Sequence, residues 1–527
     1  MKRALAKSLW IVATLQLALA GCSNKKLSGE DQRAPREIMV SEEKPTGGRD
    51  EVAGVATAGA PDSKRMVGGQ RIDGAIGSTT PMTMQPGLAR PPAPPLPRDD
   101  RDTSGEGYKD YGQNPMTDTA ADNLSTFAVD VDTASYSIAR RKIHDGALPP
   151  AAAVRVEEWL NYFKYDLAGP GDGKMPFAVH MDAAPSPFHP GRHLVRVALA
   201  TNPPTLAERK PAHLVFLVDV SGSMQSPDKL ELARRSLRIL VDNLRDGDTV
   251  ALVTYAGSTR VVLEPTGLDK KAEIHAAIED LTAGGSTAMG AGIELAYGLA
   301  AKNLSSDSVS RVIVLSDGDA NVGNTGQDEI LATIADKVKE GVTLSTVGFG
   351  VGNYKDERME QLANKGNGNN VYIDGLSQAR RVFAEQLGAT LQVVAKDVKI
   401  QVEWNKAAVR RYRLVGYENR DVRDVDFRDD RVDAGEIGAG HAVTALYEVE
   451  LEDSRSPLAT VRIRHKAPNG TVATEHTVDF ARADLAATFA SAAIDLRWST
   501  AVAATAEILR GSKEAAGWKL DDVRAIA

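Results

Sequence analysis

Short apolar runs alternate with amphipathic stretches along residues 211–393 of the chain. The runs predict strands at 213–219, 249–255, 259–264, 311–316, 343–349 and 371–373. The stretches between them predict helices over 227–244, 270–281, 288–303, 326–340, 355–364 and 377–391. Strands that alternate with helices of about ten or more residues are typical of an open, mostly parallel sheet covered on both faces. We therefore expect an α/β doubly wound domain, with 249–264 folded as an antiparallel hairpin at one edge.

The residues on either side of this domain follow a β-rich pattern. On the N-terminal side, 121–210 predicts two helices, over 135–144 and 151–163, and a strand pair at 176–184 and 192–201. On the C-terminal side, 394–527 predicts strands at 397–404, 443–452, 458–465 and 471–480, then a helical stretch. Neither flank alone has enough strands for a stable sheet with a buried face. We expect the two flanks to form one β-sandwich in which the α/β domain is inserted.

The first 120 residues lack a sustained hydrophobic period. Three basic residues precede the apolar run 9–20, which is the order of a secretory signal, and the run is too short to span a membrane as a helix. Residues 22–120 are rich in Pro, Gly, Ser and Asp, with an extreme at 91–97, and predict a disordered tether.

The end of the signal, Leu19-Ala20-Gly21-Cys22, resembles that of bacterial lipoproteins. The resemblance implies that residues 1–21 are removed and that Cys22, the only cysteine in the chain, is diacylated and anchors the protein in a membrane. Ser23 favours the outer membrane of a Gram-negative cell. We therefore expect an extracytoplasmic, lipid-anchored protein of the cell envelope.

The overall composition narrows the range of partners. The chain has 71 acidic and 63 basic residues, and aromatic residues make up 5%. A basic surface and aromatic stacking platforms are the usual marks of nucleic-acid binding, and both are missing from this composition. We expect no nucleic acid among the partners.

Hard oxygen donors follow two strands of the predicted sheet. Asp219 ends the first strand and is followed by Ser221 and Ser223, while Asp317 ends the strand 311–316. The carboxyl ends of parallel strands lie at one edge of a sheet, and two carboxylates brought together there favour a divalent cation. Mg²⁺ prefers such ligands. Taken singly, each aspartate would only end a strand and cap the next helix.

These residues, with Thr287 in the glycine-rich loop 284–290, resemble the metal-ion-dependent adhesion site of von Willebrand factor A domains, which have a Rossmann-like sheet. The resemblance implies that Ser221, Ser223 and Thr287 bind the ion directly. Asp219 and Asp317 would act mainly through bridging water. The ion would be Mg²⁺, or alternatively Mn²⁺ or Ca²⁺, and would accept a carboxylate from a protein or peptide partner. Asp319 would lie at the rim of the site.

The flanks also resemble one bacterial subgroup of these proteins. The segments 125–136 and 154–163 match its N-terminal helper region, and the likeness extends over about residues 120 to 525. Members are often labelled calcium-activated chloride channel homologues, but this chain has no predicted transmembrane helix and the channel activity does not carry over. We expect relatives to continue beyond Ala527.

A binding protein fits these patterns better than an enzyme. The chain contains no phosphate-binding Gly-Lys-Ser/Thr loop, no Gly-x-Ser-x-Gly elbow and no His-Glu-x-x-His pair. Two alternatives stay open: a structural envelope lipoprotein whose metal only stabilises it, and a metal-dependent hydrolase. A further Asp-x-Asp pair, Asp130 and Asp132, is predicted to cap the helix that starts near Thr133, the alternative being a second metal site.

Overall fold

The computed structural model describes residues 105–171, 175–203, 209–286, 288–319, 326–432 and 434–527. The predicted signal peptide, the lipidation site Cys22, most of the predicted tether and Thr287 lie outside these residues. None of the described helices combines the length and the apolar composition that crossing a membrane requires.

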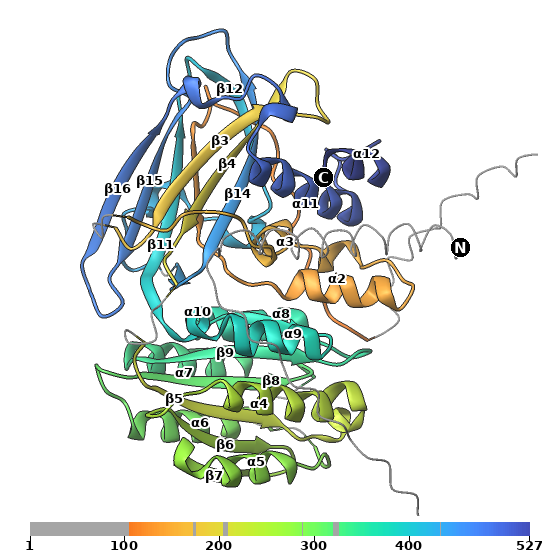
Figure 1. The fold of residues 1–527 in the computed structure, drawn as a ribbon, viewed down its shortest axis with the longest axis vertical. Coiled ribbons are helices and arrows are strands. Elements are labelled where there is room, and N and C mark those ends of the chain that lie inside the picture. Colours follow the sequence, from red (N-terminus) through yellow and green to blue (C-terminus); the bar gives the residue numbers. More distant parts are fainter. Residues whose placement is uncertain (1–104, 172–174, 204–208, 287, 320–325, 433) are drawn as a thin grey trace, which may run out of the picture. The chain divides into compact units, whose positions relative to one another are not determined.

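A six-stranded sheet forms the centre of the α/β domain (Figure 1). Its order is β10 (Asn370–Ile373), β9 (Val342–Phe349), β8 (Val309–Ser316), β5 (Ala212–Asp219), β6 (Thr249–Tyr255) and β7 (Thr259–Gly267). Neighbouring strands are parallel except β6 and β7, which form the antiparallel edge hairpin expected from the sequence. All six strands were predicted within three residues at either end.

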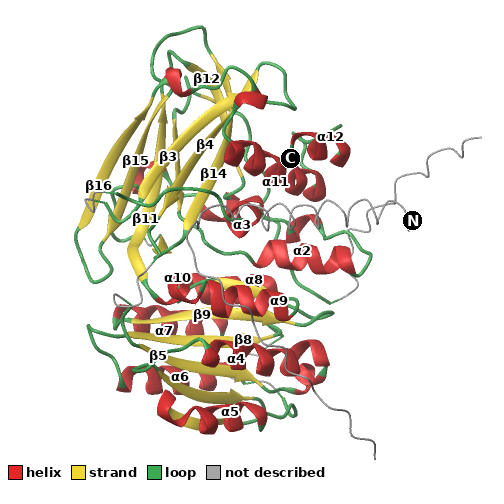
Figure 2. Cartoon of the chain, in the orientation of Figure 1, coloured by secondary structure: helices red, strands yellow, loops and turns green. Residues whose placement is uncertain are grey.

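Helices cover both faces of this sheet (Figure 2). One face packs against α4 (Leu232–Asp242), α5 (Lys271–Glu279), α9 (Leu376–Arg380) and α10 (Leu387–Leu391). The other packs against α6 (Met289–Lys302), α7 (Gln327–Lys339) and α8 (Asp356–Lys365). In β5, Leu214 and Phe216 belong to the first core and Val215 and Leu217 to the second. A strand buried on both faces must be apolar at every position, which explains its unbroken apolar run.

The two flanks of the α/β domain build a β-sandwich together, as predicted. One sheet has the order β1 (Thr117–Asp118), β12 (Val409–Val415), β14 (Ala442–Leu451), β4 (Arg192–Ala200) and β3 (Ala178–Pro185). The other contains β13 (Gly435–Gly438), β11 (Val393–Trp404), β15 (Ala459–Lys466) and β16 (Ala473–Phe480), with β2 (Leu124–Ala128) paired to β11. Phe127 and Trp404 lie in the core between the sheets.

Three helices pack together beside the sandwich. Tyr136 of α2 (Ala134–His144) and Trp159 of α3 (Val156–Tyr162) meet edge to face with ring centroids 5.1 Å apart. Their cluster continues through Leu496 of α11 (Ile494–Arg510), a helix whose neighbour is the C-terminal α12 (Leu520–Ile526). This aromatic packing fixes the helper region against the C-terminal region, which are far apart in sequence.

The predicted tether ends earlier than residue 120. Gly107 forms a parallel bridge with Lys355 of the α/β domain, and β1 pairs with β12. Glu106 is buried and ion-paired with Arg141 of α2 over 2.8 Å. These contacts are polar or limited to the backbone, so residues 105–120 carry no hydrophobic period that a sequence reading could detect.

Candidate metal centre

Adjacent parallel strands bring the predicted carboxylates to one edge of the sheet. Val218 of β5 is in register with Leu315 of β8, so Asp219 lies beside Ser316 and the following Asp317. The chain leaves β5 toward β6 on one side, while β8 lies on the other. Ligands of open α/β sheets bind at such a switch point, beyond the carboxyl ends of the strands.

Asp219 is fully buried and held by three donors. Its Oδ1 accepts the backbone N–H of Ser221 over 2.9 Å. Its Oδ2 accepts the hydroxyls of Tyr255 at 3.2 Å and Ser316 at 2.9 Å. Burial raises the pKa of Asp219, and the neighbouring Asp317 adds to this rise, while the bonds from the serines oppose it.

Asp317 is also fully buried, and protein donors again occupy both of its oxygens. Oδ1 accepts the backbone N–H of Asp319 over 3.0 Å. Oδ2 accepts the ammonium of Lys229 at 3.0 Å and the side-chain amide of Asn353 at 3.1 Å. The same amide donates to Asp319 over 3.0 Å, which places that carboxylate at the exposed rim expected from the sequence.

The two serines lie beside these carboxylates on a braced turn. Ser221 Oγ and Ser223 Oγ are 3.0 Å apart. The backbone N–H of Gly222 donates to Gly285 O at 3.0 Å, and that of Gly284 donates to Val220 O at 2.7 Å. The glycine-rich loop is thus fixed against the serine turn. Thr287 follows in that loop, outside the described residues.

The donor set fits a small hard cation. Each aspartate already accepts hydrogen bonds on both oxygens, so a directly bound ion would rely on the hydroxyls. Hydroxyl and water ligands leave the charge of Mg²⁺ largely uncompensated, and Mg²⁺ keeps several waters in protein sites. This arrangement is compatible with the roles that the adhesion-site resemblance implies for the serines and aspartates.

Several residues that surround the site were not predicted from the sequence. Ser316 stands in the Ser-Asp-Gly motif, so its position was available from the sequence. Lys229 and Asn353 carried no comparable signal, because a lysine at the start of a helix and an asparagine in a glycine-rich loop usually face solvent. Lys229 lies 88 residues from Asp317 in the chain, and only the fold joins them.

The Asp130–Asp132 pair does not cap α2, contrary to the prediction. Thr133 is the residue at the cap, and it makes no side-chain bond there. The N-terminal N–H of Ser135 is accepted instead by Glu158 of α3 at 2.8 Å. Because α2 starts at Ala134, both aspartates stand outside the N-cap position from which a side chain reaches the first turn.

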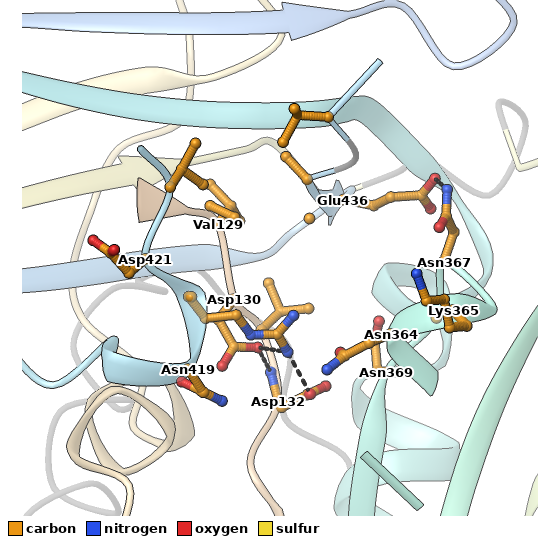
Figure 3. Close-up of a pocket in the computed structure, with 18 of the residues that line it drawn as sticks. Val129, Asp130, Asp132, Asn364, Lys365, Asn367, Asn369, Asn419, Asp421 and Glu436 are labelled. Atoms are coloured by element: carbon orange, nitrogen blue, oxygen red, sulfur yellow. Dashed lines mark hydrogen bonds and ion pairs between the residues drawn. The ribbon is translucent and has the colours of Figure 1, made fainter. Parts of the chain in front are cut away.

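The aspartate pair instead borders a polar cavity of about 340 Å³, shown in Figure 3. Arg420 bridges the two carboxylates, at 3.0 Å from Asp130 and 2.9 Å from Asp132. The last residues of α8 and the loop after it, within 364–369 of the α/β domain, also line the cavity. A guanidinium between the carboxylates supplies the positive charge that a second metal ion would otherwise bring, which disfavours metal at this position.

One other group among the described residues has metal-ligand chemistry. Ligand atoms of His189, Glu448 and Glu514 lie within 4.8 Å of one another. The Arg192 guanidinium contacts Glu448 at 3.3 Å and Glu514 at 2.7 Å, and Arg413 contacts Glu448 at 3.0 Å. These cations already neutralise the carboxylates, so the group forms an ion-pair network.

Comparison with known families divides the chain into three parts. Residues 213–385 match the von Willebrand factor type A domain model, residues 102–196 match a model described as von Willebrand factor, and residues 389–527 match the C-terminal model of uncharacterized protein YfbK. Domains of this type generally mediate protein–protein interaction and commonly bind a divalent metal.

Similar proteins include uncharacterized YfbK of Escherichia coli K12, 40% identical over 432 residues that cover 77% of this chain and 74% of the relative. Uncharacterized protein sll0103 of Synechocystis is 30% identical over 191 residues, covering 36% of this chain and 44% of that protein.

Among solved structures, a von Willebrand factor type A protein from Catenulispora acidiphila matches with 19% identity and a TM-score of 0.41, covering 66% of this chain and 81% of that one. Proximal thread matrix protein 1 from the mussel byssus, with a zinc-occupied adhesion motif, matches with 22% identity and a TM-score of 0.27, covering 34% and 45%. The identity and shared length with the E. coli protein show that this chain belongs to the YfbK family of proteins with a von Willebrand factor type A domain.

Proposed function

We propose that this protein captures a protein or peptide partner through a divalent cation held at the Asp219–Asp317 edge of its α/β domain. The ion is Mg²⁺, with Mn²⁺ or Ca²⁺ as alternatives. Ser221, Ser223 and Thr287 bind it, and the two aspartates hold its water. When bound, the ion supplies an open coordination position for a carboxylate of the partner.

The hydrogen bonding of the two aspartates carries this proposal. All four oxygens of Asp219 and Asp317 accept protein donors, so among the described residues the paired serine hydroxyls, with the Asp319 carboxylate at the rim, are the hard donors left at this edge. The serine turn and the adjoining glycine-rich loop reach the surface, since Gly222 and Ser286 are exposed and Ser223 is partly exposed, with Ser221 buried beneath them. A partner can therefore approach the hydroxyl side directly, while the carboxylates stay buried behind it.

The proposed setting is the cell envelope. Lipidation at Cys22 anchors the chain in a membrane, with outer-membrane retention favoured by Ser23, and the ordered part lies outside the cytoplasm. Replacement of Cys22 by Ser tests this placement, since it should move the protein from the membrane fraction to the soluble fraction. Equal membrane retention of the variant would contradict lipid anchoring at this residue.

The activity proposed is binding without catalysis. The central test is a pull-down from envelope extract with the full chain, run in Mg²⁺ and in EDTA. We expect a partner that is retained in Mg²⁺ and lost in EDTA, and lost in Asp219→Ala under both conditions. Asp307→Ala is the matched control, because Asp307 is exposed just before β8, at the other end of that strand.

If wild type and Asp219→Ala retain the same proteins, with and without EDTA, metal-dependent capture is contradicted. That outcome would support the alternative of a scaffolding lipoprotein whose site is only stabilising. Turnover of an envelope component that depends on the metal would support the hydrolase alternative.

A further inference from the structure

A buried lysine stands inside the candidate metal centre. Lys229 lies in the turn Pro227–Glu231 that leads into α4, and its side chain is 7% exposed. Its ammonium is 3.0 Å from Asp317 Oδ2 and 2.6 Å from Asn353 Oδ1. Lysine is almost never buried unless its charge is paired. Here the pairing partner is one of the two carboxylates expected to serve the metal ion.

The loop 350–355, which follows β9, packs against the side chain of this lysine. Gly350 has a φ of +82°, and a Cβ added there would be 2.3 Å from Lys229 Cγ, so the glycine backbone lies directly on the lysine stem. Gly350 O in turn accepts the hydroxyl of Tyr372 at 2.5 Å and the guanidinium of Arg141 at 3.1 Å. Tyr372 of β10 and Arg141 of α2 thus hold Gly350 against the lysine stem, and the ammonium stays beside Asp317.

The position of this charge opposes the binding of a cation. Asp219 and Asp317 are both fully buried, and without a cation their mutual repulsion destabilises the site. The Lys229 ammonium relieves part of that repulsion in the metal-free protein. A divalent ion entering the same cluster meets a fixed positive charge in a region of low dielectric, where repulsion between like charges is strong.

We propose that Lys229 is a built-in counter-cation of the metal centre. It compensates Asp317 when no metal is bound, and it weakens the affinity of the site for divalent cations. This inference rests on the metal site in the proposed function but is independent of the partner. It predicts that removing the charge of Lys229 strengthens metal binding, whereas removing an ordinary ligand or supporting residue would weaken it.

Calorimetric titration of MgCl₂, and separately MnCl₂, into the full metal-free chain tests the sign of this effect. Lys229→Met keeps the length of the side chain under Gly350 but removes its charge. Lys229→Gln also removes the charge and keeps a donor for Asp317. We expect both variants to bind the ion about tenfold or more tightly than wild type, because a like charge has been removed from the cluster.

Lys355→Met is the matched control. Lys355 lies just before α8, and its backbone N–H donates to Asp317 O, but its ammonium donates to Gly105 O and is not paired with either site aspartate among the described residues. We expect its metal affinity to equal that of wild type. Affinities of the two Lys229 variants that are equal to or weaker than wild type, with the control unchanged, would overturn the proposal.

Thermal unfolding gives a second readout that needs no partner. In EDTA, Lys229→Met should melt below wild type, because Asp317 then loses the ammonium that pairs with it, and the rise in Tm on adding Mg²⁺ should exceed that of wild type. If Lys229→Met fails to fold in EDTA, Lys229→Gln gives the same comparison. An equal Mg²⁺-induced rise in the variants and wild type counts against the proposal.

The two proposals fail in different ways. If wild type binds Mg²⁺ and both Lys229 variants bind it with the same affinity, only the proposed role of Lys229 is contradicted. Absence of binding in wild type and in both variants defeats the metal centre itself, and this inference with it. Binding by the variants but not by wild type would support a strong counter-cation effect.

Discussion

Arg155, the residue before α3, and Asp356 at the start of α8 form a buried ion pair that joins the helper region to the α/β domain. Both side chains are almost completely buried, and Arg155 also pairs with Glu158. Asp356 directly follows the loop 350–355, and Asn353 of that loop donates a hydrogen bond to Asp317 of the candidate metal centre. The helper region is therefore bonded to the segment that borders the site.

Removing this guanidinium should destabilise the whole fold. Arg155→Met leaves the Glu158 and Asp356 carboxylates buried without their cation, and we expect a loss of about 3–5 kcal/mol in the free energy of unfolding. Urea unfolding measures it. Lys164→Met is the control, because Lys164 and Glu385 form an exposed pair, and it should change stability by less than about 0.5 kcal/mol. Similar losses in both variants would show that the buried pair has no special role.

The C-terminal region should not fold without the helper region. β4 lies between β14 and β3, and β2 pairs with β11, so the fragment 394–527 lacks strands of both sheets. We expect this fragment to show no cooperative thermal transition by circular dichroism, whereas the full chain shows one. A cooperative transition in the isolated fragment would contradict the shared sandwich.

The glycine above Lys229 should tolerate no side chain. At Gly350, alanine must adopt a left-handed φ and push the lysine stem aside, and we expect a cost of about 1–3 kcal/mol. Gly298→Ala in α6 is the opposite case, since its added Cβ meets no atom within 4 Å, and alanine there should stabilise by about 0.5–1 kcal/mol. Denaturant unfolding of both variants tests the contrast, and a gain at both positions would refute it.

Stability should fall as the pH rises through the ionisation of Glu157. Burial raises the pKa of Glu157 to about 7, with Glu418 and Asp130 adding to the shift, against an ordinary value of 4.5. Because the folded state keeps the proton more strongly than the unfolded chain, the free energy of unfolding decreases between about pH 4.5 and pH 7.

Glu157→Gln removes this ionisation and keeps an acceptor for the backbone N–H of Tyr417. Between pH 5 and pH 8, we expect the free energy of unfolding to fall by about 1–3 kcal/mol less in the variant than in wild type. Urea unfolding at both pH values measures the difference. The exposed substitution Glu273→Gln should leave the wild-type profile unchanged. Parallel profiles of wild type and Glu157→Gln would exclude Glu157 as the cause.

Ser316 should matter for metal affinity although no role as a ligand is assigned to it. Its hydroxyl donates to Asp219 Oδ2 and accepts the backbone N–H of Gly318 at 2.9 Å, so Ser316→Ala removes one of the two donors to that oxygen and leaves the Tyr255 hydroxyl. Loss of such supporting bonds typically weakens metal affinity about 10–100-fold. Ser310→Ala is the control on the same strand, since the buried Ser310 hydroxyl has no hydrogen-bond partner among the described residues. Titration with Mg²⁺ should separate the two, and equal affinities would argue against this support.

Regular elements could be predicted wherever local pattern determined them. The central strands of the α/β domain appear in the sequence because they are buried on both faces, whereas the edge strand β7 is largely exposed or half-buried. The helices of the domain show an apolar face toward the sheet. β12 was missed for the opposite reason. Its sequence VRRYRLV reads as exposed, yet Arg413 is buried and paired with Glu448 and Glu507. The charged residues of this strand do not reveal that the partners of Arg413 lie 35 and 94 residues away in the sequence.

The sequence by itself determined the α/β order and the meeting of Asp219 with Asp317, because parallel strands end at a common edge. It also determined that the two flanks must combine, since neither has enough strands alone. The tertiary structure alone decided that Lys229 and Asn353 enter the site, that Arg420 joins Asp130 to Asp132, and that residues 105–120 pack on the fold. Hydrophobic periodicity is a local property, whereas the pairing of buried charges depends on which distant segments the fold brings together.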